Sequence, residues 1–348
     1  MFKSKNENDV EELKKDTQNF LSKVTDSYKD LTSKVSSSYS DLSSKLEDYT
    51  KSNKPKAKNT AVKFSFIPPN FGDVNKLSND LFNKDFPIGA TKLELNTNAS
   101  NGVKFTAIGI KDNKSGQVSS ELKTKFTDKL KGLTLTESWN TSNVLGTNIE
   151  LADTLTKGLK LTLNGQLHPT IGKKNAKAGF EFKQANVYTR AHVDLFKGPT
   201  IVTDAVVGNA DVLIGADVNY DVTDAKVNKF NTVVAHTSRD YTISVGASNM
   251  FGLFSFSYFH RVQPGLEAGA RAHWNKATDS AVSVEIGAKY ALDIDSFVKA
   301  KINNTGVLGL GYYQNLRQGV KLGFGASLDT TRLNENAHKV GFSFNFEG

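Results

Sequence analysis

The chain has 348 residues, no cysteine, and 44 Lys and Arg residues against 36 Asp and Glu residues, which gives a formal net charge of +8. No run reaches the roughly 18 apolar residues of a membrane helix, so a helical membrane protein is excluded. The absence of cysteine excludes disulfides, thiolate zinc sites and cysteine nucleophiles. The basic balance favours anionic partners, such as nucleotides, phosphate-bearing solutes, nucleic acid or anionic lipid.

Residues 1–65 form an extension whose composition differs from that of the rest of the chain. It contains an eleven-residue repeat, SKVTDSYKDLT (22–32) followed by SKVSSSYSDLS (33–43), and a basic linker at Lys51–Lys58. Eleven residues make three turns of about 3.67 residues each, so a helix of this sequence would carry its apolar residues on one stripe. Two interpretations remain open: a solvated or partly disordered tail, because serine is a mediocre helix former, or a helix that binds a membrane surface or a partner helix.

From about Gly89 the sequence alternates between apolar and polar residues, as β-strands with one apolar and one polar face do. Turn dipeptides such as Asn101-Gly102 separate the alternating segments, and no segments of helical periodicity lie between them. The pattern therefore predicts a long antiparallel meander. The clearest of its segments are GLTLTESWN (132–140), LFSFSYFH (253–260), GVLGLGYY (306–313) and GVKLGFGASL (319–328).

Alternation alone suits either a soluble sandwich or a membrane barrel with a polar lumen, but three observations favour the barrel. The segments have about 9–12 residues, which is the length of a tilted membrane-spanning strand. Aromatic residues such as Trp139 and Phe346 lie near segment ends, as in interfacial girdles. The polar face also carries full charges, and its predicted pore-lining basic residues are Lys160, Arg190, Arg271, Lys289, Lys299, Lys301 and Lys321.

A wide tube lined with these lysines and arginines would favour anions over cations by Coulomb attraction. Because each charge is solvated, the selectivity should be modest and should depend on salt concentration. The six histidines are scattered and cysteine is absent, so no metal site is expected. The glycines of GVLGLGYY (306–313) lack the spacing and the strand–turn–helix setting of a nucleotide-binding fingerprint.

Several longer stretches have a recognisable pattern: PPNFGDVNKLSNDLFNKDF (68–86), GLKLTLNGQLHPTIGKKNAK (158–177), YALDIDSFVKAKINNTGVLGLGY (290–312) and HKVGFSFNF (338–346). Together they resemble the mitochondrial voltage-dependent anion channels, the eukaryotic porins, from about Phe66 to Gly348. The resemblance does not extend to residues 1–60.

The resemblance implies an all-β transmembrane barrel of about 19 strands (88–348) in the mitochondrial outer membrane, preceded by an N-terminal pore helix segment (66–87). An odd strand count requires one parallel pair, between the first and last strands. The implied function is a voltage-gated, weakly anion-selective diffusion pore for metabolites, nucleotides and ions, with no enzymatic chemistry and no cofactor. Its implied contacts are membrane lipid, ATP, ADP and small anions as permeants, and a hexokinase-like protein or a second copy, but no nucleic acid.

An amphipathic helix is predicted over Asp73–Phe82, because the two prolines before it restrict the chain at its start and apolar residues recur along one face. That apolar face comprises Phe71, Val74, Leu77, Leu81 and Phe82. By resemblance, this helix lies inside the pore, and Lys76, Asp80 and Lys84 occupy positions that contact permeating nucleotides in the family. Pro87 replaces a flexible residue of the family's hinge, which argues against easy movement of the helix.

Glu137 is predicted to be a membrane-facing carboxylate. It falls in line with Leu133, Leu135 and Trp139 on the apolar face of its strand. A carboxylate is costly in that environment, so it is satisfied by a neighbour or by thinning of the bilayer, or it is retained for function. By resemblance, the family's membrane-facing glutamate takes part in contacts between copies and in hexokinase association.

Three alternatives to a metabolite pore remain open. An outer-membrane protein-import pore would share the barrel and the lumenal helix, but the basic wall argues against it. A scaffold would act through residues 1–65, and deletion of that extension would distinguish it from a pore. A soluble β-rich lipid carrier would be soluble without detergent.

Overall fold

The computed structural model describes residues 66–196, 198–276, 282–335 and 337–348. The chain divides into two compact units, Met1–Lys63 and Phe64–Gly348, and all described helices and strands belong to the second. The predicted extension over 1–65, with its eleven-residue repeat and basic linker, lies outside the described residues.

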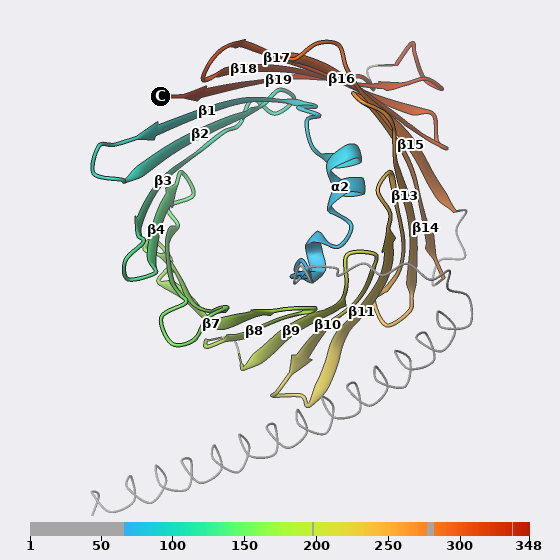
Figure 1. Ribbon diagram of the computed structural model, residues 1–348. Coiled ribbons are helices and arrows are strands. Elements are labelled where there is room, and N and C mark those ends of the chain that lie inside the picture. The colour runs from blue at the N-terminus through green and yellow to red at the C-terminus, as the bar shows by residue number, and fades with distance from the viewer. Residues whose placement is uncertain (1–65, 197, 277–281, 336) are drawn as a thin grey trace, which may run out of the picture. The chain divides into compact units, whose positions relative to one another are not determined.

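The second unit is a closed barrel of nineteen strands, as predicted (Figure 1). Consecutive strands pair antiparallel around the barrel, and β1 pairs with β2 on one side and, in parallel, with β19 on the other. The strands are β1 (Ala90–Asn98), β2 (Lys104–Asp112), β3 (Val118–Asp128), β4 (Leu133–Asn140), β5 (Leu145–Ala152), β6 (Leu159–His168), β7 (Lys173–Gln184), β8 (Val187–Asp194), β9 (Thr200–Gly208), β10 (Val212–Asp221), β11 (Lys226–Thr237), β12 (Tyr241–Ser248), β13 (Leu253–Gln263), β14 (Leu266–Asn275), β15 (Ser283–Ala291), β16 (Ser296–Asn303), β17 (Val307–Arg317), β18 (Val320–Asp329) and β19 (Lys339–Glu347).

Short turns connect many of the neighbouring strands, and glycines with a positive φ mark several of these turns. In the turn between β1 and β2, Gly102 has a φ of 80°, a conformation that glycine adopts without the clash of a Cβ atom. Gly319 has a φ of 77° between β17 and β18. Because these turns allow only a few residues between neighbours, they fix the register of each hairpin.

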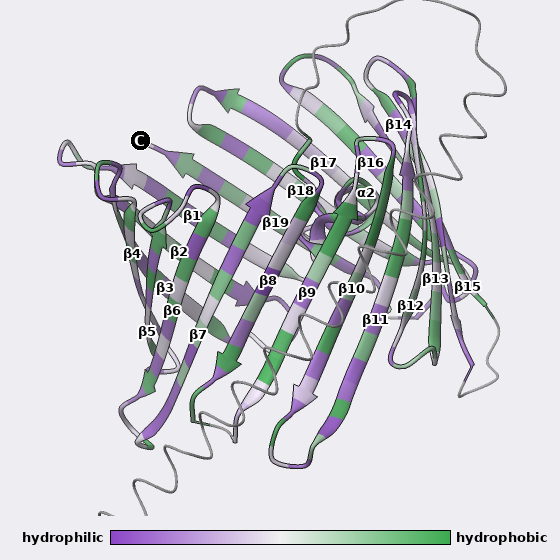
Figure 2. Ribbon diagram, turned by 60° about the horizontal axis from the view of Figure 1, so that its bottom comes forward, coloured by the Kyte–Doolittle hydropathy of each residue, from purple (hydrophilic) through white to green (hydrophobic). Residues whose placement is uncertain are grey.

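Period-two alternation gives the barrel two chemically different faces, and Figure 2 shows bands of hydrophobic and hydrophilic residues along the strands. Cross-strand partners share a face, so the register carries the assignment from strand to strand. On β16, Lys299 and Lys301 contact the helix inside the barrel, which identifies their side of the sheet as lumenal. The opposite side carries large exposed apolar residues such as Phe324, Phe344 and Ile286.

Before β1, the chain runs inside the barrel as a 3₁₀ turn, η1 (Phe71–Asp73), and a helix, α2 (Lys76–Asn83) (Figure 1). The helix therefore starts three residues later than the sequence predicted, because the Asn70 side chain accepts a hydrogen bond from the Asp73 backbone N–H and stabilises a separate turn first. Leu77, expected on the buried stripe, is 37% exposed. Within the described residues, no helix is both long and apolar enough to cross a membrane.

Candidate functional site

The C-terminal end of α2 is held by two lysines of the barrel wall. Lys299 Nζ donates hydrogen bonds to the backbone carbonyl oxygens of Asp80 (2.6 Å) and Lys84 (2.8 Å). Lys301 Nζ donates to the carbonyl oxygen of Phe82 at 2.7 Å. The Phe82 carbonyl lies in the last turn and has no partner within the helix, so Lys301 supplies a donor that it lacks. The Asp80 carbonyl also accepts the Lys84 backbone N–H at 3.3 Å, so Lys299 adds a second donor there. Lys299 is only 3% exposed, because α2 covers it.

Apolar and cationic contacts surround the same end of the helix. Phe82 is fully buried and packs with Leu81 and Phe259 of β13. The Arg271 guanidinium lies 4.7 Å from the centre of the Phe82 ring, within the range of a cation–π contact. Full burial of one phenylalanine contributes roughly 2–3 kcal/mol, so this contact is a substantial part of the attachment.

The other end of the lumenal segment packs on β8–β11 through a separate apolar cluster. Val74 is 7% exposed there, and Phe66 and Phe71 pack against the cluster's edge. Beside the cluster, Asp204 is bound by the Arg190 side chain, and the Phe71 backbone N–H approaches the same carboxylate. The wall residues of this cluster are Tyr188, Val206, Leu213, Val233 and Ala235.

Glycines on the lumenal face leave the space that the segment occupies. A Cβ atom added to Gly311 of β17 would lie 2.5 Å from the Asp85 carbonyl oxygen, and one added to Gly325 of β18 would lie 2.5 Å from that of Pro87. Both distances are shorter than any side chain tolerates, so these positions require glycine for space rather than for a positive φ. Further glycines meet the segment in the same way: Gly215, Gly269, Gly287 and Gly341.

The three predicted nucleotide contacts lie along the helix and do not meet in one pocket. The Lys76 side chain, at the start of α2, is 62% exposed and lies 3.8 Å from Asp73. Lys84 is the residue after the last turn, and its carbonyl oxygen binds Lys299. Within the described residues, no hydrogen bond or ion pair joins the side chains of Lys76, Asp80 and Lys84.

The predicted pore-lining residues all lie on the lumenal face, but the wall is less basic than the sequence suggested. Six of the seven pair with carboxylates, and Lys321 has no ion pair among the described residues. The pairs are Lys160 with Glu150 and Glu181, Arg190 with Asp204, Arg271 and Lys301 with Glu285, Lys289 with Glu267, and Lys299 with Asp85. The sequence pattern places Glu285 on the same polar face as these cations, but it did not predict which carboxylate pairs with which cation.

Glu137 lies on the opposite, outer face of β4 and is exposed. Its cross-strand neighbours are Thr124 on β3 and Thr147 on β5, which share that face. A charged side chain at this position therefore has two hydroxyl-bearing neighbours in an otherwise apolar surface. No hydrogen bond or ion pair of the Glu137 side chain is present within the described part of the chain.

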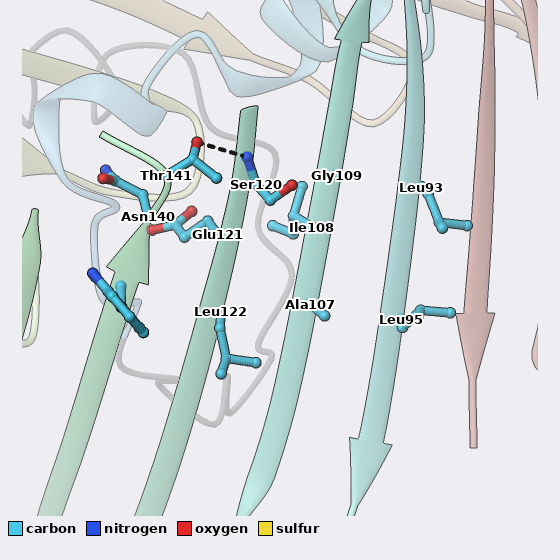
Figure 3. Close-up of a pocket in the computed structure, with 11 residues that line it drawn as sticks. Leu93, Leu95, Ala107, Ile108, Gly109, Ser120, Glu121, Leu122, Asn140 and Thr141 are labelled. Carbon is cyan, nitrogen blue, oxygen red and sulfur yellow. Dashed lines mark hydrogen bonds between the residues drawn. The ribbon is translucent and has the colours of Figure 1, made fainter. Parts of the chain in front are cut away.

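A groove of about 450 Å³ lies across β1–β4 and includes Trp139, but not Glu137, among its lining residues (Figure 3). Small residues leave room at its centre, and larger apolar side chains border it. Trp139, two residues from Glu137, is 60% exposed at its edge, where the indole N–H donates to the Asn143 side chain at 3.2 Å. The other side chains on the outer face of the groove are Leu93, Leu95, Ala107, Ser120 and Leu122.

The comparison with known proteins decides the family. A family model described as eukaryotic porin matches residues 67–341. The chain belongs to the eukaryotic porin family. A "Mitochondrial outer membrane protein porin" from Candida albicans is 44% identical, and one from Neurospora crassa is 43% identical; each match covers 80% of this chain and 99% of the relative.

A "Voltage-dependent anion-selective channel" from Drosophila melanogaster is 38% identical to this porin, over 80% of this chain and 99% of the relative. As the names of the fungal relatives state for them, the membrane of this porin is the mitochondrial outer membrane. No group of three or more His, Asp or Glu side chains that could hold a metal ion occurs among the described residues.

Proposed function

We propose that this porin is a voltage-gated, weakly anion-selective diffusion pore for metabolites, nucleotides and ions. The observation that carries the proposal is the wall of the barrel, where charged side chains face the lumen and most cations have a carboxylate partner. A cation that is paired with a carboxylate attracts anions less than an unpaired one, so such a wall should be weakly selective. The name of the insect relative supports the same function.

The proposed path for solutes runs past the exposed side of α2. There, Lys76 and the exposed side chain of Lys84 present positive charge to the lumen, whereas the carboxylate of Asp80 reduces it. Nucleotide phosphates would meet these groups as mobile, solvated ions rather than in a closed pocket. Contacts of this kind raise the local concentration of a solute without trapping it.

The test is current recording from the purified full-length porin in a planar bilayer. In a KCl gradient, the open pore should show a small reversal potential of the sign for Cl⁻ preference, and conductance should fall when the voltage is raised in either direction. Replacing Lys160 and Lys321 by Glu should move the reversal potential toward K⁺ preference. A protein that does not conduct, or one whose reversal potential ignores both substitutions, would contradict the proposal.

A partner role for the outer face of β4 is the second proposal, and it is favoured by the exposed Glu137, which lies on the same face as Trp139 of the groove. A carboxylate in an apolar surface is better solvated against a polar partner than against lipid. The partner is a second copy of this porin or a hexokinase-like protein. Cross-linking in liposomes distinguishes these partners. If copies pair through this face, the Glu137→Gln variant should give less cross-linked dimer than the parent. If a hexokinase-like protein binds there, the variant should give less cross-linked product with added hexokinase.

A further inference from the structure

We infer that Lys299 and Lys301 are positioning residues that latch the lumenal helix to the wall, and that this latch sets the voltage at which the pore closes. The second half of this inference rests on the proposed function, and the first half does not. The latch consists of the two ammonium groups and the three carbonyl oxygens of Asp80, Phe82 and Lys84.

The contact is specific for the C-terminal end of a helix. The aligned peptide dipoles of α2 place partial negative charge on its last carbonyl groups, where a cation is stabilising. Lys299 and Lys301 are two residues apart on β16, so both point to the same side of the sheet. One lysine spans two carbonyls a turn apart, and the other reaches the carbonyl between them.

The burial of Lys299 indicates that it binds the helix and does not contact permeating ions. Its side chain is 2% exposed, and its remaining neighbours are the Asp85 carboxylate at 3.6 Å and the Phe86 ring at 5.3 Å. A buried ammonium group without such partners is strongly unfavourable, so the docked segment and the charged lysine stabilise each other. A permeating anion meets Lys299 only after α2 has moved away.

The opposite end of the segment has its own contacts with the wall. The Phe71 backbone N–H, at the start of η1, approaches the carboxylate of Asp204, and the apolar cluster around Val74 holds the same end. Because η1 is a turn of three residues before α2 begins, these contacts are separate from the lysine contacts at the end of α2. Loss of the lysine contacts therefore leaves this end attached.

The lumenal glycines make this docked position unique. Gly287 and Gly269 receive the Phe82 and Leu81 side chains, and Gly311 and Gly325 receive the backbone that follows. A helix shifted along the wall would meet side chains instead of these glycines. The lysine contacts therefore form in one docked position of the segment. The free energy of these contacts adds to the work that a voltage must do to release the segment.

The natural absence of cysteine allows a direct test with the full-length porin in liposomes. A spin label attached to Asn79→Cys, on the exposed side of α2, reports the motion of the helix. We expect a mostly immobile spectrum in the parent and, in the Lys299→Met/Lys301→Met variant, an increase of about tenfold or more in the ratio of mobile to immobile label, because charge-assisted hydrogen bonds are lost. In bilayer recordings the same variant should close at a smaller voltage.

Two further variants separate a latch from a general loss of stability. Lys301→Arg keeps a cationic donor and should leave the label immobile, whereas Lys301→Met should increase the mobility of the label. The Lys301 side chain is 20% exposed, so neither substitution buries a new group. Lys321→Met removes a lumenal cation that does not contact α2, and it should alter the reversal potential without mobilising the label.

The outcomes are separable. A label that stays immobile in the double Met variant overturns the latch, whether or not the protein conducts. A mobile label with an unchanged closing voltage keeps the latch as an anchor and overturns its role in closure. A parent protein that does not conduct contradicts the proposed function, while the spin-label spectra still decide whether the lysines hold the helix.

Discussion

Glu137 is a carboxylate on the outer, largely apolar face of the barrel. It is exposed on the outer face between Thr124 and Thr147, with apolar residues beyond them. We expect Glu137→Gln to stabilise the barrel in a bilayer by about 1 kcal/mol, because the variant no longer places a carboxylate against hydrocarbon. The shift in the midpoint of denaturant-induced unfolding in lipid vesicles measures this gain.

The matched control is Glu150→Gln, which changes a carboxylate on the lumenal face. Glu150 is part of the Lys160 pair and has access to water, so its loss should leave stability unchanged or slightly lower. An equal gain in both variants would show that the benefit is a general effect of lower charge and not of the position of Glu137.

Gly311 gives a prediction about space. In Gly311→Ala, the new methyl group would overlap the Asp85 carbonyl oxygen, so the segment must shift or leave its seat. We expect a loss of about 1–3 kcal/mol in the free energy of unfolding, typical of overpacking, and faster proteolysis of the segment that precedes β1. Gly109→Ala on β2 is the control, since its added Cβ would make only an ordinary 3.9 Å contact with Ser120. A similar loss of unfolding free energy in both variants would show that Gly311 is not required to make room for the segment.

The packing role of the lumenal glycines was not predicted from the sequence. Gly309 and Gly311 are two apart in GVLGLGYY, and Gly323 and Gly325 repeat the spacing in the next strand. The sequence excluded a nucleotide-binding fingerprint there, but it did not predict that these glycines leave space for a packed segment. A run of glycines on one face of neighbouring strands is the signal that could have indicated a packed segment, because side chains are missing from the same strip of wall.

For the helix and its flanking turn, the structure predicts distinct consequences of two deletions. Removal of residues 1–65 leaves η1 and α2 in place, so a pore should conduct as the full chain does, whereas a scaffold that acts through the extension would lose its role. Removal of residues 1–87 also takes away the segment that covers Lys299 and occupies part of the lumen. We expect larger conductance and stronger Cl⁻ preference in the second protein, because two cations lose their carbonyl partners.

Recordings of both truncated proteins under one KCl gradient provide the comparison. Equal conductance of the two would mean that α2 does not restrict the path of ions. Reduced Cl⁻ preference after removal of residues 1–87 would mean that the charges on the segment, rather than the uncovered wall, dominate selectivity.

At the level of elements, the local sequence predicted strands and faces well and long-range partners poorly. Period two determines which side chains share a face, and turn glycines determine the hairpins, so both follow from neighbours in the chain. The Lys299–Asp80 contact joins residues 219 positions apart. The helix boundary was also missed, because a side-chain cap from Asn70 competes with the helix at its start.

For the whole pore, the paired charges predict a selectivity that depends strongly on salt. The Debye length falls from about 10 Å at 0.1 M to about 3 Å at 1 M ionic strength, so a wall charge influences much less of the lumen in concentrated salt. The permeability ratio of Cl⁻ to K⁺ should therefore approach the ratio in free solution as KCl is raised at a constant gradient. A ratio that does not change with concentration would point to a narrow binding site instead of a diffuse field.

The parallel pairing of β1 with β19 dictates the order in which the barrel can be assembled. Each of the other pairs joins strands that follow one another in the chain, so hairpins can be added in sequence as they emerge. The β1–β19 pair, which aligns Thr91–Asn96 with Phe342–Glu347, brings together strands separated by almost the whole barrel, and the loop-closure entropy makes it the slowest contact to form. Until then both edges are open, so an insertion apparatus has to shield two unpaired strands from lipid and from other chains.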